Sequence, residues 1–442
     1  MFTRLRLHNF KAWKDTGDVA LKPLTLLLGT NSSGKSSLIQ SLLLLRQTVL
    51  SPDPTIHLNL GGDEVNDLFN FGEFDDVLFQ GVEGTRTFSI GLDFSTQRRA
   101  VRTSSFKCDY VKTRSGSVAV QNLLLADSDT TFRALRGEKG AYSIFIGDES
   151  QPRAQGRNYA PERSIAFPER VIHKIIKETK DKKALQRSIT DAFRVRNLSL
   201  ALRRELEAIS YLGPLRRKPE RDYPWNKTRP GELGTDGRRT IDALLASELL
   251  AKSESHGNNM INGVSEWLKR MGVAQKLEVR QQGRSNRYAL IVHRDGVACN
   301  LRDVGIGISQ VLPILVIAYF APPRSTVILE EPEIHLHPLA QSVLAELFIE
   351  ISKKRNVQFI VETHSEHLFR RLQTLAAQEK ITSDDAALYF VEHDSKQAIL
   401  QKLEMDAYGR VQNWPKNFFG NALEETAEQA RLAFERMAKA AK

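Results

Sequence analysis

The chain has 442 residues, of which 41% are hydrophobic and 26% charged, a composition typical of a globular protein with a sizeable core. Its two cysteines, Cys108 and Cys299, exclude a disulfide framework and show no metal-ligand spacing. No apolar run is long enough to cross a bilayer of about 30 Å, and the first ten residues lack the apolar core of a secretory signal. We therefore expect a cytoplasmic protein with no membrane partner.

The net charge of +10 is concentrated in one segment, because residues 170–221 contain 15 Lys or Arg and six Asp or Glu. Such clustering is typical of a surface that binds DNA or RNA. It is equally compatible with a solvated helical face, or with a surface that meets an acidic protein. The side chains predicted to form this basic surface are Arg203, Arg204, Arg216, Arg217 and Lys218.

The N-terminal part of the chain predicts alternating strands and a glycine-rich loop. Residues 2–13 alternate polar and apolar side chains, which indicates a half-buried strand. Residues 24–28 (LTLLL) are wholly apolar, as in a strand buried on both faces. The sequence GTNSSGKS follows at 29–36, and residues 36–50 have the length and composition of a buried helix. Strand, loop and helix in this order form the context of a phosphate-binding P-loop.

The GTNSSGKS segment fits the pattern G-x4-G-K-[ST] at every defined position. Backbone N–H groups of such a loop and the helix after it point at phosphate oxygens. Lys35 is predicted to bridge the β- and γ-phosphates as a catalytic residue, and Ser36 to bind Mg²⁺. ATP and Mg²⁺ are therefore the expected cofactors. The residues expected around the phosphates are Asn31, Ser32, Ser33, Gly34, Lys35, Ser36 and Ser37.

The middle of the chain predicts a sheet followed by helices. Residues 87–145 consist of short alternating runs separated by turns, which favours an antiparallel sheet. Helical spacing follows over 170–210 and 240–272, with an irregular basic stretch at 213–239 between them. Alternating strands and helices then return. Their expected ranges are the strands 289–293, 326–330 and 357–361 and the helices 308–320 and 339–354.

Two carboxylates end the strand in STVILEEPEIHLHP, residues 325–338. The carboxyl end of a central strand is where α/β sheets bind ligands. Glu330 is predicted to hold the Mg²⁺ shell through a water, and Glu331 to accept a proton from the water that attacks the γ-phosphate. His335 and His337 alternate in a turn without a third ligand at fixed spacing, so we expect a structural role for them.

Two further motifs indicate phosphate contacts. In LRDVGIGISQVLPIL, residues 301–315, Gly305 and Gly307 precede Ser309 at the start of an apolar helix. Backbone amides, a hydroxyl and a helix N-terminus would then face one point. In VQFIVETHSEHLF, residues 357–369, His364 follows the end of a buried strand and is a candidate phosphate contact.

In this order, the motifs resemble the ATP-binding cassette superfamily, and in particular the ATPase heads of SMC, RecF and OLD-type proteins and the bacterial AAA-15/AAA-21 group. The similarity covers residues 1–80 and 285–370, while residues 211–225 and 408–420 resemble members with a DUF3696-type tail. The resemblance implies an α/β P-loop NTPase fold with an antiparallel β-lobe and an inserted helical subdomain. The expected parts are an N-terminal ATPase lobe (1–150), a basic helical insertion (151–284), a C-terminal ATPase lobe (285–395) and a tail (396–442).

The resemblance also implies that two protomers enclose ATP between them, so that a homodimer or higher homo-oligomer is expected. Gly307 and Ser309 of one copy would complete the nucleotide site of the other. His364 would be the switch histidine at the γ-phosphate and act in catalysis.

Three more residues are assigned through the resemblance. Lys11 and Trp13 lie at the positions where such ATPase heads approach the nucleoside. Gln80 lies roughly at the position of the family's Q-loop glutamine, which contacts the metal. The chain also departs from the transporters of this superfamily, which have Asp at the position of Glu330 and a different signature from GIGISQ. No heptad pattern is present, so no long coiled-coil arm is expected.

These features favour an ATP-hydrolysing switch that regulates a nucleic-acid-directed process, such as an anti-phage defence system with a separate effector. That effector would be a nuclease encoded by a neighbouring gene. One alternative is an OLD-like nuclease, although residues 390–396 (FVEHDSK) have no later D-x-D partner to complete a metal site. Another alternative is a scaffold that ATP stabilises without significant turnover.

Overall fold

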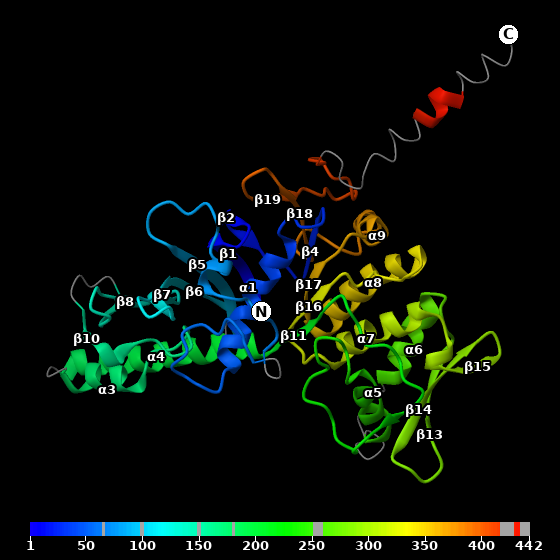
Figure 1. Ribbon diagram of the computed structural model, residues 1–442, viewed down its shortest axis with the longest axis horizontal. Coiled ribbons are helices and arrows are strands. Elements are labelled where there is room, and N and C mark those ends of the chain that lie inside the picture. The colour runs from blue at the N-terminus through cyan, green and yellow to red at the C-terminus, as the bar shows by residue number, and fades with distance from the viewer. Residues whose placement is uncertain are drawn as a thin grey trace.

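The computed structural model of the protein describes residues 1–63, 67–97, 101–147, 152–178, 182–250, 260–415 and 428–433. Within these ranges the strands form three sheets, and the buried apolar side chains form two large cores. Figure 1 shows the antiparallel sheet with α3 and α4 on one side of the molecule, and α5, α6 and the smallest sheet on the other.

The first sheet is antiparallel, as the sequence predicts for residues 87–145, and its order is β10-β9-β8-β7-β6-β5-β1-β2 with β3 beside β1. Its strands are β1 (Phe2–Phe10), β2 (Trp13–Asp15), β3 (Val19–Ala20), β5 (Thr87–Gln97), β6 (Val101–Lys112), β7 (Val118–Ala126), β8 (Thr131–Arg136), β9 (Tyr142–Ile146) and β10 (Ala154–Gly156). Helices α1 (Lys35–Leu50), α3 (Glu169–Glu178) and α4 (Lys182–Glu207) share its core.

The central sheet has the order β11-β16-β17-β4-β18-β19, and all its pairs are parallel except β18 with β19. Its strands are β4 (Leu24–Gly29), β11 (Ile209–Leu212), β16 (Thr326–Glu330), β17 (Gln358–Glu362), β18 (Ala386–His393) and β19 (Ala398–Leu403). Because parallel strands end at the same edge, the ends of β4, β16 and β17 lie together there.

The central sheet separates the two cores. Along β4, Leu26 and Leu28 enter one core, whereas Leu27 enters the other, as the two-residue period of a strand requires. This explains why the run LTLLL is wholly apolar, since both faces of β4 are covered. The helices of the second core include α7 (Ile306–Phe320), α8 (Pro338–Arg355) and α9 (Glu366–Ala377).

The third sheet is antiparallel and consists of β12 (Tyr223–Pro224), β13 (Lys276–Gln281), β14 (Arg287–Arg294) and β15 (Val297–Asn300). It packs with α5 (Thr240–Leu249) and α6 (Met260–Arg270) in the second core. The strand expected over 289–293 therefore belongs to this small sheet and not to the central one.

Residues 151–284, expected as one helical insertion, are divided between the two cores. Val195 and Leu202 of α4 pack with the antiparallel sheet, whereas Leu244 of α5 and Trp267 of α6 pack with α7 and α8. In the C-terminal tail, residues 428–433 are helical, and residues 416–427 and 434–442 lie outside the described residues. No helix in the described ranges has the length and apolar character needed to span a membrane.

Candidate nucleotide-binding site

The P-loop turns sharply between the end of β4 and the start of α1. Gly29 has a φ of 142°, and a Cβ at this position would overlap the carbonyl oxygen of Val391 on the neighbouring strand β18. Gly34 has a φ of 108° and caps the start of α1. Both glycines therefore adopt backbone conformations that side chains disfavour. Asn31 and Ser32 are exposed, Ser33 is buried, and the Ser37 N–H donates to the Gly34 carbonyl.

Lys35 is folded back onto this loop. Its Nζ donates to the carbonyl oxygens of Thr30 at 2.7 Å and Gly29 at 3.2 Å, and only 3% of the residue is exposed. Burial lowers the pKa of Lys35, while Glu362, whose Oε1 lies 3.8 Å from Nζ, acts in the opposite direction. The ammonium group thus lies inside the turn where a phosphate chain would enter.

Trp13 and Lys11, the two residues predicted to lie near the nucleoside, both form hydrogen bonds inside the chain. The Trp13 side chain is fully buried, and its Nε1–H donates to the Gly34 carbonyl at 3.2 Å. The indole therefore supports the P-loop through Gly34, and its predicted place at the nucleoside stays a prediction. Lys11 Nζ donates to Gln40 of α1 at 2.7 Å and lies 4.9 Å from the centre of the Phe71 ring.

The register of the central sheet brings a second carboxylate to the loop. Glu330 at the end of β16 pairs with Glu362 at the end of β17. The Ser36 hydroxyl donates to Glu362 Oε1 at 3.0 Å. Sequence reasoning missed Glu362, although its position after four buried residues of β17 repeats the pattern that identified Glu330.

Glu330, at the end of β16, is one strand further from β4 and the P-loop than Glu362 is, and its carboxylate has a different hydrogen-bond partner. Its Oε1 accepts a hydrogen bond from the Tyr211 hydroxyl at 3.0 Å. Burial, reinforced by Glu362, raises the pKa of Glu330 to about 7. The carboxylate in contact with the predicted magnesium ligand Ser36 is thus Glu362. The predicted role of Glu330, which holds the Mg²⁺ shell through a water, stays a prediction.

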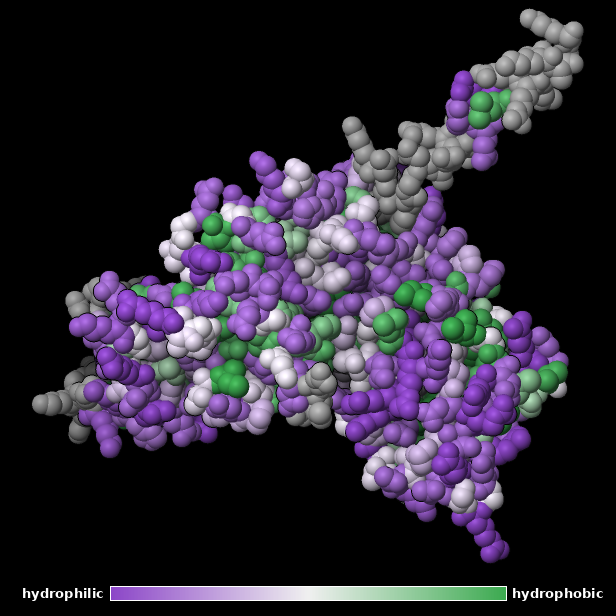
Figure 2. All heavy atoms as spheres, viewed as in Figure 1, coloured by the Kyte–Doolittle hydropathy of each residue, from purple (hydrophilic) through white to green (hydrophobic). Residues whose placement is uncertain are grey.

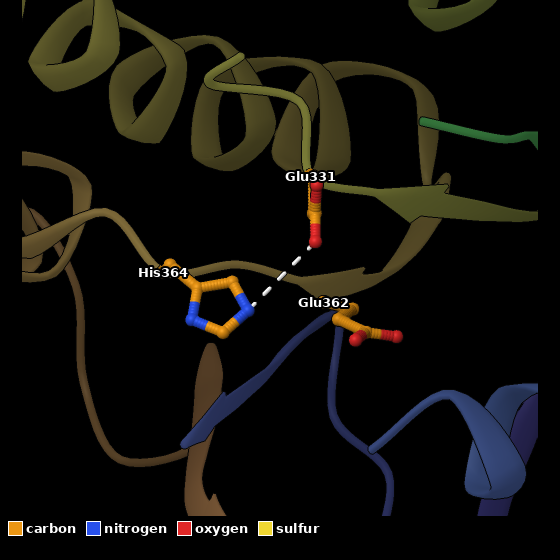
Figure 3. A group of neighbouring side chains, drawn as sticks. All are labelled: Glu331, Glu362 and His364. Atoms are coloured by element: carbon orange, nitrogen blue, oxygen red, sulfur yellow. Dashed lines mark ion pairs between the residues drawn. The ribbon is translucent and has the colours of Figure 1, made fainter. Parts of the chain in front are cut away.

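Glu331 projects from the turn after β16 toward His364. Its backbone has a φ of 44°, and its N–H donates to the Glu362 carbonyl at 2.8 Å. Glu331 Oε1 lies 3.8 Å from His364 Nε2, and Figure 3 shows these groups facing each other with Glu362 beside them. The backbone N–H of His364 donates to Glu333 Oε1 at 2.6 Å. Burial, followed by the charge of Lys35, lowers the pKa of His364, which keeps its imidazole neutral at pH 7.

Arg216 lies beneath the acidic turn. Its guanidinium donates to the carbonyl oxygens of Glu330 at 3.0 Å and Glu331 at 3.1 Å, and the residue is 7% exposed. Burial lowers its pKa to about 10, so it remains protonated at neutral pH. This corrects the expectation that Arg216 forms part of a nucleic-acid surface. Charge alone suggested a surface position, because no local pattern reveals a partner more than 100 residues away.

The start of α7 lies against the turn after Glu331. A Cβ on Gly307 would lie 3.0 Å from the His335 carbonyl oxygen, so this close approach favours glycine. Ser309 is 6% exposed and its hydroxyl donates to the Ile306 carbonyl at 2.8 Å. Ser309 is therefore largely buried in the single chain, and its predicted contact with the nucleotide of a second copy stays a prediction. The exposed residues at this helix start are Gly305 and Ile306.

Two other predictions have different outcomes. His337 is the N-cap of α8, where its Nδ1 accepts from the Leu339 N–H at 3.4 Å, and its predicted structural role is confirmed. Gln80 is exposed and follows Phe79, whose N–H donates to the Asn9 carbonyl. Across the described ranges, no hydrogen bond joins Gln80 to the P-loop or the acidic turn. Its role at the metal stays a prediction.

The loop between β4 and α1, on a parallel sheet with acids at the same edge, defines the P-loop NTPase class. Residues 24–370 match the family described as "AAA domain, putative AbiEii toxin, Type IV TA system", and the chain belongs to this family. Residues 381–429 match the DUF3696 family, a protein family of unknown function. The predicted resemblance to the AAA-21 group with a DUF3696-type tail is confirmed.

One curated relative is an OLD nuclease of Thermus scotoductus, which is 30% identical over 102 residues. The match covers 22% of this chain and 19% of the relative, so the chain spans about a fifth of that protein. Among solved structures, the SMC head domain from Thermotoga maritima has a TM-score of 0.43 and 13% identity, with coverages of 91% of this chain and 99% of that one. An SmcHead bound to the C-winged helix domain of ScpA has a TM-score of 0.46 and 12% identity, with coverages of 92% and 98%.

Proposed function

We propose that the protein binds ATP with Mg²⁺ at the P-loop and hydrolyses the γ-phosphate. The observation that carries this proposal is that Lys35, Ser36, Glu331, Glu362 and His364 meet at one edge of the central sheet. They come from the ends of three strands, and Ser36 and Glu362 are 326 positions apart in sequence. A lysine, a hydroxyl, carboxylates and an imidazole at the end of a P-loop match the groups that phosphoryl transfer uses.

The residues present fit a triphosphate. The buried Ser33 Oγ has no hydrogen-bond partner among the described residues, and Lys35 Nζ bonds to loop carbonyls that phosphate oxygens would replace as its partners. Ser36 and Glu362 would hold Mg²⁺, which neutralises charge on the phosphates when bound. The positively charged start of α1 would add to the same attraction.

Glu331 is the proposed general base. Its side chain is 33% exposed, so a water can reach it, and its carboxylate can accept a proton from that water. The Glu331 N–H and carbonyl are held by Glu362 and Arg216, respectively, which fixes the direction of the side chain. His364, which is neutral at pH 7, would orient the water or donate a hydrogen bond to the phosphate.

We further propose that two copies associate over the nucleotide. Large apolar side chains are exposed on segments that adjoin the acidic turn: Leu215 is 85% exposed, and Ile306 and Leu339 are each 54% exposed. Leu215 adjoins Arg216, and Ile306 adjoins Gly307 at the turn that follows Glu331. A rim of this kind is typical of a surface that a partner covers. The amides at Gly305–Gly307 would face the nucleotide of the second copy.

The process that this ATPase regulates is proposed to be directed at nucleic acid, in a bacterial anti-phage defence system with a separate effector. The family description names a toxin, and the curated relative is a nuclease, which supports this assignment. Hydrophilic side chains dominate the surface over α3 and α4 (Figure 2). The exposed basic side chains there include Arg170, Lys177, Arg196 and Arg204. An OLD-like nuclease and an ATP-stabilised scaffold are the alternatives.

The decisive experiment measures phosphate release from ATP by the purified chain in Mg²⁺ and after addition of EDTA. We expect Mg²⁺-dependent turnover that Lys35→Ala and Ser36→Ala each abolish. Turnover that survives both substitutions would belong to a contaminant. Stoichiometric ATP binding without phosphate release would favour the scaffold instead.

A further inference from the structure

The acidic edge of the central sheet contains more negative than positive charge. Glu331 and Glu362 interact electrostatically with each other and with their acidic neighbours. Among the described residues that interact with this edge, four are acidic and two are basic. They are Glu330, Glu331, Glu333 and Glu362 against Lys35 and Arg216. The acidic groups thus outnumber the basic ones, and a bound cation would favour their ionised forms.

Three candidate ligand atoms lie near one another at this edge. One atom each from Glu331, Glu362 and His364 lies within 4.8 Å of the others, and Glu331 Oε1 is 3.8 Å from His364 Nε2. Atoms bound to one zinc ion at about 2.1 Å each can be at most about 4.2 Å apart. Small side-chain rotations would therefore bring all three into a common coordination sphere.

Glu362 supplies an independent indication of a ligand. The residue is 5% exposed, and while its Oε1 accepts from Ser36, its buried Oε2 has no hydrogen-bond partner in the described part of the chain. An unpaired buried carboxylate oxygen loses its hydration without compensation, so native structures rarely keep one without a partner. The oxygen belongs to one of the three side chains drawn in Figure 3.

We propose that Glu331, Glu362 and His364 bind one first-row divalent cation, such as Mn²⁺ or Zn²⁺, in the absence of nucleotide. Two carboxylates with one imidazole suit these ions better than Mg²⁺, which prefers oxygen ligands alone. Three protein ligands leave coordination positions open to water or a phosphate oxygen. The site uses residues of the proposed ATPase but does not require ATP to be hydrolysed.

Lys35 is the alternative source of positive charge at Glu362. Its Nζ lies 3.8 Å from Oε1 and bonds more closely to two carbonyl oxygens of the loop. It therefore neutralises Glu362 only in part and does not approach the Glu331–His364 pair as a hydrogen-bond donor. Removing the charge of Lys35 should strengthen the binding of the cation, and the same change should weaken the binding of nucleotide. These opposite effects separate the cation site from the ATP site.

The test uses the full chain, stripped with a chelator and kept free of nucleotide, titrated with Mn²⁺ or Zn²⁺ alone. Calorimetry and, for Mn²⁺, the loss of the free-ion spin-resonance signal measure binding. We expect one ion per chain, at least ~10-fold weaker binding in Glu362→Gln and in His364→Asn, and a Tm that metal raises in the wild type but not in these two variants. Lys35→Met should bind the ion at least as tightly as the wild type.

Glu278→Gln is the matched control, because Glu278 Oε2 also contacts a histidine, His293 Nε2 at 2.8 Å, without a third ligand nearby among the residues that the structure describes. It should leave metal binding unchanged. Wild-type affinity in both Glu362→Gln and His364→Asn would overturn the proposal, as would the absence of binding at micromolar metal. Loss of binding in Lys35→Met would likewise contradict it, because the ion would then need the nucleotide lysine. None of these outcomes bears on whether ATP is hydrolysed.

Discussion

At the level of single residues, Glu331 combines a strained backbone with an accessible carboxylate. Its φ of 44° is uncommon for a residue with a side chain. Its backbone N–H donates to the Glu362 carbonyl, and its own carbonyl accepts from Arg216. Hydrogen bonds therefore hold the backbone of Glu331 in this conformation, while its side chain stays one-third exposed. Such an arrangement suits a group that must meet a water molecule in one direction.

We predict that Glu331→Gln binds ATP but hydrolyses it at least ~100-fold more slowly, because removal of a general base typically costs two to four powers of ten. Phosphate release and equilibrium nucleotide binding are the two measurements. The amide is nearly isosteric, so the Tm should change little. Turnover near that of the wild type would exclude Glu331 as the base and direct attention to Glu362.

His57 provides a pH-dependent term in stability, remote from the acidic turn. Its Nδ1 accepts from the Val120 N–H at 3.1 Å, and burial, with a smaller effect of Arg136, lowers its pKa from 6.5 to about 4. The folded state thus binds the proton less readily than the unfolded state. The stabilisation is complete above pH 6.5 and is lost as the pH falls toward 4.

We therefore predict that the free energy of unfolding falls with acidification between pH 6.5 and 4, by as much as about 3 kcal/mol from this group. His57→Asn retains an acceptor for Val120 without a titrating ring, so its stability should depend less on pH in this window. Urea titrations at several pH values compare the two chains. Equal pH dependence would mean that His57 is accessible to protons in the folded state.

At the level of elements, the P-loop is determined by sheet packing as well as by phosphate chemistry. Gly29 is the last residue of β4 and pairs with Val391 of β18, and a Cβ would overlap the Val391 carbonyl. Trp13 closes the other side of the loop through Gly34. The packing of the sheet thus favours glycine at this position, whatever ligand the loop binds.

Gly29→Ala should lower the free energy of unfolding by about 1–3 kcal/mol or more, as overpacked core sites do. Gly62→Ala is the matched control, since Gly62 has a similar φ of 128° but no described heavy atom lies within 4 Å of the position that its Cβ would take. Chemical denaturation of both variants separates the steric clash from backbone strain. Equal losses in the two would show that strain alone disfavours a side chain at Gly29.

For the molecule as a whole, the apolar rim around the site predicts assembly. In Glu331→Gln, which retains ATP, we expect ATP-dependent dimers of the 49.9 kDa chain, detected by light scattering. Adding Ile306→Asp should leave only monomers, because a charge would be buried in the interface. Val297→Asp is the control, since Val297 is 59% exposed on β15 and away from the turn after Glu331. ATP-independent mass in every variant would contradict the proposed interface.

The basic face of α3 and α4 predicts salt-dependent binding of nucleic acid. Arg217 and Arg221 form ion pairs with Glu220 and Asp303, so the exposed side chains on the two helices are better candidates. Replacing Arg170, Arg196 and Arg204 with Ala should flatten the log–log salt slope by roughly two to three on duplex DNA. Turnover without DNA should persist.

Arg280→Ala, on the separate sheet and paired with Glu278, is the control for that slope. Absence of binding at ~50 mM salt would leave α3 and α4 as a solvated face. A triple variant that binds DNA normally but loses an acidic partner protein would assign the face to that partner.

Local sequence patterns were sufficient for the elements that carry the P-loop and the first acids. The strands expected over 24–28 and 326–330 are observed as Leu24–Gly29 and Thr326–Glu330, and the helix expected over 308–320 begins two residues earlier. Each of these segments is defined by the apolar period and boundary residues of a few consecutive positions. Such information is local, so it can be read without knowledge of the fold.

The remaining features of the site depend on contacts between distant parts of the chain. Ser36 meets Glu362 across 326 positions, and Arg216 meets the carbonyl of Glu330 across 114. The order and register of parallel strands bring the first pair together, and packing beneath the acidic turn buries the second. The motifs were therefore enough to identify which residues could serve a P-loop ATPase. The contact of Glu362 with Ser36, and the internal positions of Arg216 and Trp13, became evident only in the folded chain, because strand register and side-chain burial arise from packing between distant segments.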